Sequence, residues 1–167
     1  MKRFVLSLCL LLLNACSLPL TPISSSSTGN CGSQWATKDL PELTRQLDAS
    51  IKSLDPNAKA WATAYGEDCI YADGHADFSA LETDFNVTLQ VSDLSNEADL
   101  GGWIVKVMQI VENIPEEKIM GPQPGRVSIA FQAGSEQKFV NFYLNQYQIL
   151  PSGLSDTEIY EALQTPQ

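Results

Sequence analysis

The sequence is poor in histidine, in basic charge and in long apolar runs. Among its 167 residues there is one histidine, and 10 basic residues stand against 20 acidic ones. This acidic balance disfavours nucleic acid and anionic lipid headgroups as electrostatic partners. The apolar run at residues 4–13 (FVLSLCLLLL) is far shorter than the ~20 residues that span a bilayer as a helix. The length and position of this run are typical of the core of an export signal instead.

The residues around this run have the layout of a signal peptide. Two basic residues precede it, and a four-residue segment follows it: Leu13, Asn14, Ala15 and Cys16. This ending resembles the lipobox of bacterial lipoproteins, although Asn14 departs from the usual small residue. The resemblance implies cleavage before Cys16, acylation of its thiol with chains such as palmitate, and anchoring to a bacterial membrane on its extracytoplasmic side. An ordinary secretory signal cleaved after Ala15 is the alternative.

Cysteine is also scarce, and its four positions divide by role. Cys9 lies in the apolar run and Cys16 is the expected lipid site, so that Cys31 and Cys69 remain. In an exported protein an even remainder predicts a disulfide, with two separate thiols as the alternative. No metal or other cofactor is expected, because two cysteines and one histidine without paired spacing do not form the usual zinc ligand set.

The chain divides into three parts. Residues 1–15 are the expected signal peptide, and residues 37–167 form one domain. Residues 16–36 are rich in Ser, Thr, Pro and Gly, which predicts a flexible tether after the lipid site. Without its signal the chain keeps 8 basic and 20 acidic residues, a net charge of −12.

Hydrophobic periodicity predicts the elements of the domain. Leu43, Leu47 and Ile51 recur at helical spacing, while Phe85 and Val87 alternate with polar residues as in a strand with one buried face. The order α-β-β-α-β-β-α indicates an α+β fold, with an antiparallel sheet of about four strands and helices packed on one face. The expected helices are 39–54, 95–114 and a short one that begins with the capping-box sequence from Ser155 to Glu158. The expected strands are 58–65, 84–92, 126–132 and 139–150, with an interruption at residues 66–69 and a turn at residues 72–75.

Alternation also assigns aromatic and amide side chains to the second face of this sheet. Aromatic rings provide contact area and amides provide directed hydrogen bonds, a combination that suits an extracytoplasmic protein or glycan partner. The alternative is that these rings pack under a loop or onto the tether. The residues assigned to this face are Trp61, Tyr65, Asn86, Thr88, Gln90 and Tyr143. Phe139, Asn141, Asn145 and Tyr147 join them if the last strand keeps its alternation.

The competing hypothesis concerns the acidic segment around His75. An imidazole beside a carboxylate could act as a base in a hydrolase, and carboxylates could hold a hard cation. The segment matches no EF-hand loop, and a solvated turn with a surface histidine is the plain alternative. We therefore expect a non-enzymatic binding or scaffolding domain, with a hydrolase or metal-binding protein as the alternative. The acidic residues of the segment are Glu67, Asp68, Asp73, Asp77, Glu82 and Asp84.

Overall fold

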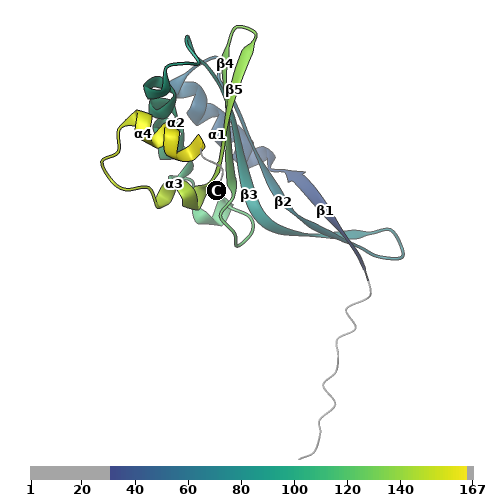
Figure 1. Cartoon of the computed structure of the whole chain (residues 1–167). Helices are drawn as coiled ribbons and strands as arrows, with labels where there is room; N and C mark the ends of the chain where they lie inside the picture. Colours follow the sequence, from purple (N-terminus) through teal and green to yellow (C-terminus); the bar gives the residue numbers. More distant parts are fainter. Residues whose placement is uncertain (1–30, 165–167) are drawn as a thin grey trace, which may run out of the picture.

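One five-stranded sheet organises the computed structural model of the chain, which describes residues 31–164. Helices cover one face of the sheet (Figure 1), so the expected α+β class is confirmed. The expected signal peptide, Cys16 and most of the expected tether lie outside the described residues. The elements are β1 (Gly32–Asp39), α1 (Pro41–Leu54), β2 (Lys59–Ile70), β3 (Ala76–Gln90), α2 (Glu97–Val111), the 3-10 helix η1 (Glu116–Lys118), β4 (Arg126–Ala133), β5 (Glu136–Tyr143), α3 (Leu144–Gln148) and α4 (Asp156–Gln164).

The sheet is mixed, and its strands lie in the order β1-β2-β3-β4-β5. Three neighbouring pairs are antiparallel, but β3 and β4 are parallel, with Val87 opposite Ile129. The expectation of about four antiparallel strands is therefore met in part: the sheet has five strands, and one of the neighbouring pairs is parallel. Parallel strands need a long crossover connection, and residues 91–125, which include α2, provide it.

The additional strand, β1, begins within the segment that composition assigned to the tether. Residues 32–36 of the expected tether belong to it. It pairs with β2 along its whole length, from Gly32 opposite Ile70 to Asp39 opposite Thr63. Its side chains are exposed on both faces, with one exception that is half-buried, so no hydrophobic alternation marks it in the sequence. Pairing with β2, and not local pattern, makes this segment a strand.

The last expected strand, 139–150, ends early. β5 stops at Tyr143 because β4 begins opposite it, at Arg126, and offers no partner beyond that point. The side chain of Gln146 accepts a hydrogen bond from the Tyr143 N–H at 2.7 Å, and the chain continues as α3. Asn145 and Tyr147 belonged to the expected strand, and they lie in α3 instead of the sheet.

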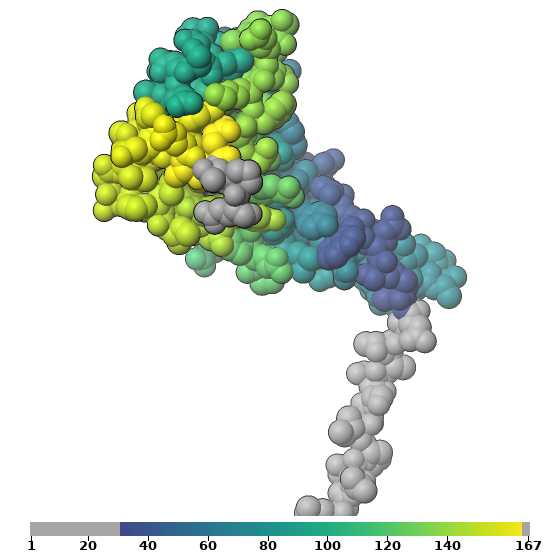
Figure 2. Space-filling view, in the orientation of Figure 1, coloured from purple at the N-terminus to yellow at the C-terminus, as the bar shows by residue number. Residues whose placement is uncertain are grey.

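The β2–β3 hairpin is longer than alternation predicted. The interruption expected at residues 66–69 is absent, and a bulge lies between Tyr65 and Gly66, with Leu81 as the extra residue on β3. Beyond the bulge, the hairpin and the adjoining part of β1 extend past the helices as an arm (Figures 1 and 2). The Tyr71 N–H donates to the His75 carbonyl at 3.0 Å and the Gly74 N–H donates to the Tyr71 carbonyl at 2.9 Å, which closes the turn at the tip, where a turn was expected.

Cys31 and Cys69 form the expected disulfide, with their Cα atoms 5.3 Å apart. Cys31 directly precedes β1, and Cys69 lies near the end of β2. The bond therefore fastens the beginning of the edge strand to its neighbour. For a sequence separation of 38 residues the chain-entropy model gives a contribution of about 4 kcal/mol to stability.

α1 lies closely against β2. The apolar stripe expected for the helix is buried, and it faces a row of alanines whose small side chains permit a close approach. This contact forms one side of the hydrophobic core. The buried residues are Leu43, Leu47 and Ile51 on α1, and Ala60, Ala62 and Ala64 on β2.

α1 also completes the hydrogen bonding of β2 where β1 no longer pairs with it. The pairing with β1 ends at Thr63. Past that point, the Thr44 hydroxyl accepts a hydrogen bond from the Ala62 N–H, and the Asp48 carboxylate accepts one from the Ala60 N–H, both at 3.0 Å. These two side chains satisfy N–H groups that an uncovered strand edge would leave unpaired.

No helix in residues 31–164 is long and apolar enough to cross a membrane. α2 and α4 pack against each other at the other end of the helix layer. Ser155 and Glu158 form the capping box expected at the start of α4. Gly101 on α2 lies so close to Asp156 that a Cβ would overlap the Asp156 carbonyl. A Cβ on the next residue, Gly102, would lie 3.0 Å from the Asp156 carboxylate, a side chain that can move aside.

Replacing Gly101 by Ala should therefore lower the free energy of unfolding by about 1–3 kcal/mol, because the added methyl group pushes α4 away from α2. Gly102→Ala is the matched control, and it should change stability by less than about 1 kcal/mol, in the stabilising direction that alanine brings to a helix. Urea denaturation of both variants measures the difference. Equal stability of the two variants would contradict the close α2–α4 contact.

Candidate functional site

The sheet has one face without helices, which we call the open face. Residues that pair directly across strands share a face, so the register places Trp61 and Asn86 together with Ser128 and Asn141 on this side. The buried apolar residues of β3, β4 and β5 alternate with them and point to the helices. All six residues that alternation assigned to one face lie on the open face: Trp61, Tyr65, Asn86, Thr88, Gln90 and Tyr143.

Aromatic rings on the open face are accessible. Trp61 and Tyr143 are each 44% exposed, and Phe139 is 57% exposed. Trp35 on β1 is 58% exposed and stacks on Tyr65, with 5.5 Å between the ring centroids. The rings are therefore not buried under a loop in the part of the chain that the structure describes. Trp35 was not among the predicted residues of this face, because the composition around it is typical of a tether.

Hydrogen-bonding side chains lie between these rings. Gln90 and Gln132 are joined by an amide–amide hydrogen bond of 3.0 Å across β3 and β4. Asp84 accepts a hydrogen bond from the Arg126 N–H at 2.9 Å, and the two side chains approach to 4.0 Å. The face therefore combines flat apolar area with directed polar groups, as protein interaction surfaces do.

A pocket of about 500 Å³ opens beside Glu82, and we call it the Glu82 pocket. Glu82 lies on the open face, opposite Tyr65 on β2, and a bridge to Gln123 covers its other side. The loop that carries Gln123 is held against β3, where the Thr83 hydroxyl donates to the Met120 carbonyl at 2.9 Å. Three segments thus meet here, and their lining residues are Glu82, Gln123, Pro124, Tyr143, Asn145 and Gln146.

Glu82 is an acid in an unfavourable place. Its side chain belongs to a residue only 6% exposed. Burial raises the pKa of Glu82, and the neighbouring Asp84 carboxylate raises it further, while Arg126 acts in the opposite direction. A buried acid with a raised pKa at the edge of a pocket is a recognised mark of a functional position.

The sequence holds a signal for this position, although the run of acidic residues groups Glu82 with the His75 segment. Asn86 is on the open face, and residues two and four positions before it on a strand share that face. Extending the alternation backwards from Asn86 therefore places Asp84 and Glu82 beside the predicted aromatic face. The covering loop and Tyr143, which make the pocket, come from distant segments and carry no local signal.

His75 is not close to these acids. It lies at the exposed tip of the arm, where its ring stacks on Tyr71 and its Nδ1 lies 2.5 Å from the Asp73 carboxylate. Hydrogen bonds from the His75 backbone and side chain lower the pKa of Asp73. Along β3, about 20 Å separates the tip from Glu82. The hydrolase hypothesis requires His75 and two carboxylates to converge in a cleft. Among residues 31–164 they do not converge.

Residues 31–164 contain no group of three or more His, Cys, Asp or Glu side chains placed to hold a metal ion. Asp73 and Asp77 both lie near the tip of the arm, and Asp73 is occupied by His75. The acidic segment therefore does not form the calcium site that was considered as an alternative.

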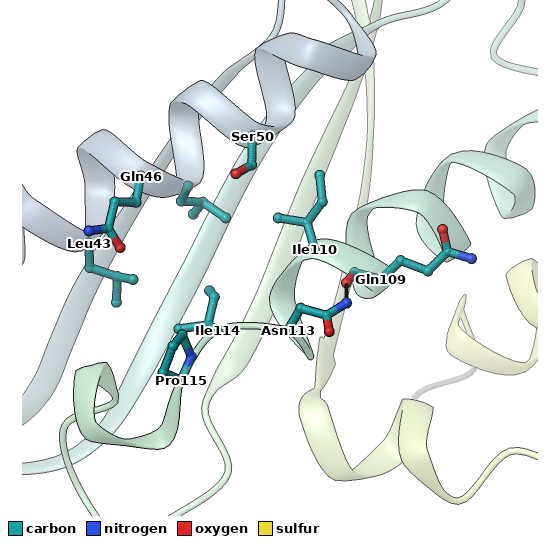
Figure 3. Close-up of a pocket in the computed structure, with 9 residues that line it drawn as sticks. Leu43, Gln46, Ser50, Gln109, Ile110, Asn113, Ile114 and Pro115 are labelled. Carbon is teal, nitrogen blue, oxygen red and sulfur yellow. Dashed lines mark hydrogen bonds between the residues drawn. The ribbon is translucent and has the colours of Figure 1, made fainter.

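A second pocket, of about 290 Å³, lies in the helix layer between α1 and α2 (Figure 3). Gln46 and Ser50 face it from α1, and Ile110 and Asn113 from α2 and the turn that follows it. The Asn113 amide donates to the Gln109 carbonyl at 2.6 Å. None of its lining residues is titratable, so this pocket offers no acid or base.

The chain matches no family model, and no curated protein or solved structure matches it. The open face and the Glu82 pocket are therefore the features from which a function can be inferred.

Glu82→Gln should stabilise the protein at neutral pH. The folded-state pKa of Glu82 lies above its ordinary value of 4.5. The protonated Glu82 side chain therefore stabilises the fold below pH 4.5, and this stabilisation is lost as the pH rises through the folded-state pKa. Glutamine has nearly the same shape and carries no charge. The urea midpoint of the variant should exceed that of the original chain at pH 7, and the two should converge near pH 4.

Glu117→Gln is the matched control, because this exposed residue on η1 loses the same charge without any burial. Its urea midpoint should equal that of the original chain at both pH values. A lower midpoint for Glu82→Gln at pH 7 would mean that the Glu82 carboxylate stabilises the fold.

Proposed function

We propose that this protein is a membrane-anchored envelope lipoprotein whose domain binds an extracytoplasmic protein or glycan through the open face. The observation that supports the proposal is the difference between the two faces of the sheet. Helices bury one face, while the other presents Trp61, Phe139 and Tyr143 to solvent. Accessible rings with amides between them are more typical of an interaction surface than of an ordinary solvated strand.

A binding role fits the described residues better than a catalytic one. The histidine lies at the tip of the arm, away from the acids on the open face. The Glu82 pocket is lined by amides, one carboxyl, one proline and one aromatic ring. Such groups recognise a ligand by hydrogen bonding and stacking, and none of them is an activated nucleophile.

The anchoring part of the proposal depends on residues 1–16. The short apolar run and the segment ending in Cys16 resemble a lipoprotein signal, and Ser-, Thr- and Pro-rich chain leads from there to Cys31. Cys31 is joined to Cys69 on the arm. In this arrangement the domain meets its tether at the arm, and the net charge of −12 keeps it away from an anionic lipid surface.

The binding role predicts contacts at the open face in the cell envelope. A photo-crosslinking amino acid placed at Phe139 should give adducts, because this exposed position lies on the proposed interface. The same amino acid at Ala49, an exposed position on α1, should give none. Gel mobility of the irradiated chain measures the adducts.

A second change makes the test specific. Trp61→Ala should reduce adduct formation from Phe139 about tenfold or more, since tryptophan is a frequent hot spot of binding energy. Ile149→Ala is the control, because it removes an exposed apolar side chain outside the sheet. Equal adduct yields from Phe139 and Ala49, or no effect of Trp61→Ala, would refute the open face as the binding surface.

The anchoring role predicts the fate of a Cys16→Ser variant. Without the thiol, neither lipid attachment nor cleavage before residue 16 should occur, so the full-length precursor should accumulate without acyl chains. Mass spectrometry and metabolic labelling with palmitate measure both features. A normally cleaved, soluble product from Cys16→Ser would contradict lipid anchoring and indicate an ordinary secretory signal.

A further inference from the structure

The Glu82 carboxyl lacks a hydrogen-bond donor from the protein. Among residues 31–164 no donor hydrogen-bonds to it, and the neighbouring Asp84 carboxyl has no proton to share once both groups are ionised. A residue only 6% exposed is normally paired with a donor. Glu82 instead lines a pocket of about 500 Å³ that is open to ligands. Its carboxyl oxygens can therefore accept hydrogen bonds from water or from a ligand in this pocket.

The charged groups around the pocket leave one acid without a matching cation. Arg126 is the nearest base, and its guanidinium lies 4.0 Å from the Asp84 carboxylate and 5.9 Å from the centre of the Tyr143 ring. It therefore neutralises Asp84 first. Glu82 faces the pocket with negative charge that Arg126 offsets only in part.

The other walls of the pocket suit a cation carried on an apolar stem. Tyr143 offers a half-exposed ring, and Pro124 adds a second apolar surface. A ring face attracts an ammonium group, and methylene groups pack against both surfaces. Gln123 and Asn145 supply amide oxygens as further acceptors.

We propose that the Glu82 pocket binds the ammonium group of a lysine side chain on a basic segment of the partner protein. An ammonium group has three donors and no acceptor, so it can bridge Glu82 and the amide oxygens. A guanidinium prefers a two-pronged contact with one carboxylate, whereas the pocket offers amide groups beside the single Glu82 carboxyl. The net charge of −10 attracts such a segment. This inference rests on the proposed binding function and names its partner chemistry.

The test uses NMR with the full chain in a non-ionic polyoxyethylene detergent. The probes are three capped peptides, Gly-Ser-X-Ser-Gly, in which X is lysine, arginine or norleucine. The lysine peptide should shift the amide resonances of Glu82, Gln123 and Gln146 saturably, with an affinity above that of the arginine peptide. The norleucine peptide, which keeps the stem and lacks the charge, should not shift them.

Glu82→Gln should weaken binding of the lysine peptide at least about tenfold, a loss of about 1.4 kcal/mol. Glu117→Gln lowers the negative charge of the chain equally and should change the affinity by less than about twofold. Equal affinity of the lysine and norleucine peptides, or unchanged affinity in Glu82→Gln, would overturn the proposal. Tighter binding of the arginine peptide would overturn the preference for an ammonium group.

Free glucosamine distinguishes an amino sugar from a protein side chain. If glucosamine shifts the same resonances and binds with higher affinity than the lysine peptide, the pocket recognises a glycan and the protein partner is refuted. The two proposals also fail separately. Loss of peptide binding with crosslinking at Phe139 intact removes only the lysine pocket, whereas loss of crosslinking with peptide binding intact removes the wider interface.

Discussion

The contact between α1 and β2 determines which face of this sheet is buried and which face stays open. Alanines at alternate positions of β2 let the helix lie close, and Thr44 and Asp48 hydrogen-bond the N–H groups that β1 leaves free. Leu43, Leu47 and Ile51 then have a defined surface to cover. Once one face is buried in this way, the strict alternation of β2 and β3 turns every intervening ring and amide to the opposite side. The open face is therefore a consequence of how the core is built.

Within this arrangement, Glu82 lies where an ionised carboxylate lowers the stability of the fold. A buried acid beside another carboxylate costs free energy when both are ionised, and a neutral residue of the same size would avoid that cost. The bulge at Leu81, the loop that carries Gln123 and the end of β5 all meet at this residue. Bulges often lie beside binding sites, where they direct a side chain. The local structure thus keeps a buried carboxyl with a raised pKa at the edge of a pocket.

Local periodicity was sufficient to predict most helices and strands, and to predict the face of the sheet on which the aromatic residues lie. The leucine stripe of α1, the capping box of α4 and the alternation around Asn86 all depend on residues close together in the chain. The errors concern long-range pairing. Residues 32–36 look like tether and become a strand because β2 lies beside them. Residues after Tyr143 alternate like a strand and become a helix because β4 offers them no partner. The Glu82 pocket combines three distant segments, so the face on which its one acid lies can be read from the alternation around Asn86, and its walls cannot be read from any local pattern.

The disulfide also decides where mechanical force enters the domain. Tension applied to the chain ahead of Cys31 would, without that bond, act on the first pair of β1 and peel the edge strand away one hydrogen bond at a time. With Cys31 joined to Cys69, the same tension passes directly to β2, which is hydrogen-bonded on both sides. Pulling along an internal strand shears many bonds at once instead of opening them in sequence. The edge strand is thereby shielded from force that is applied ahead of Cys31.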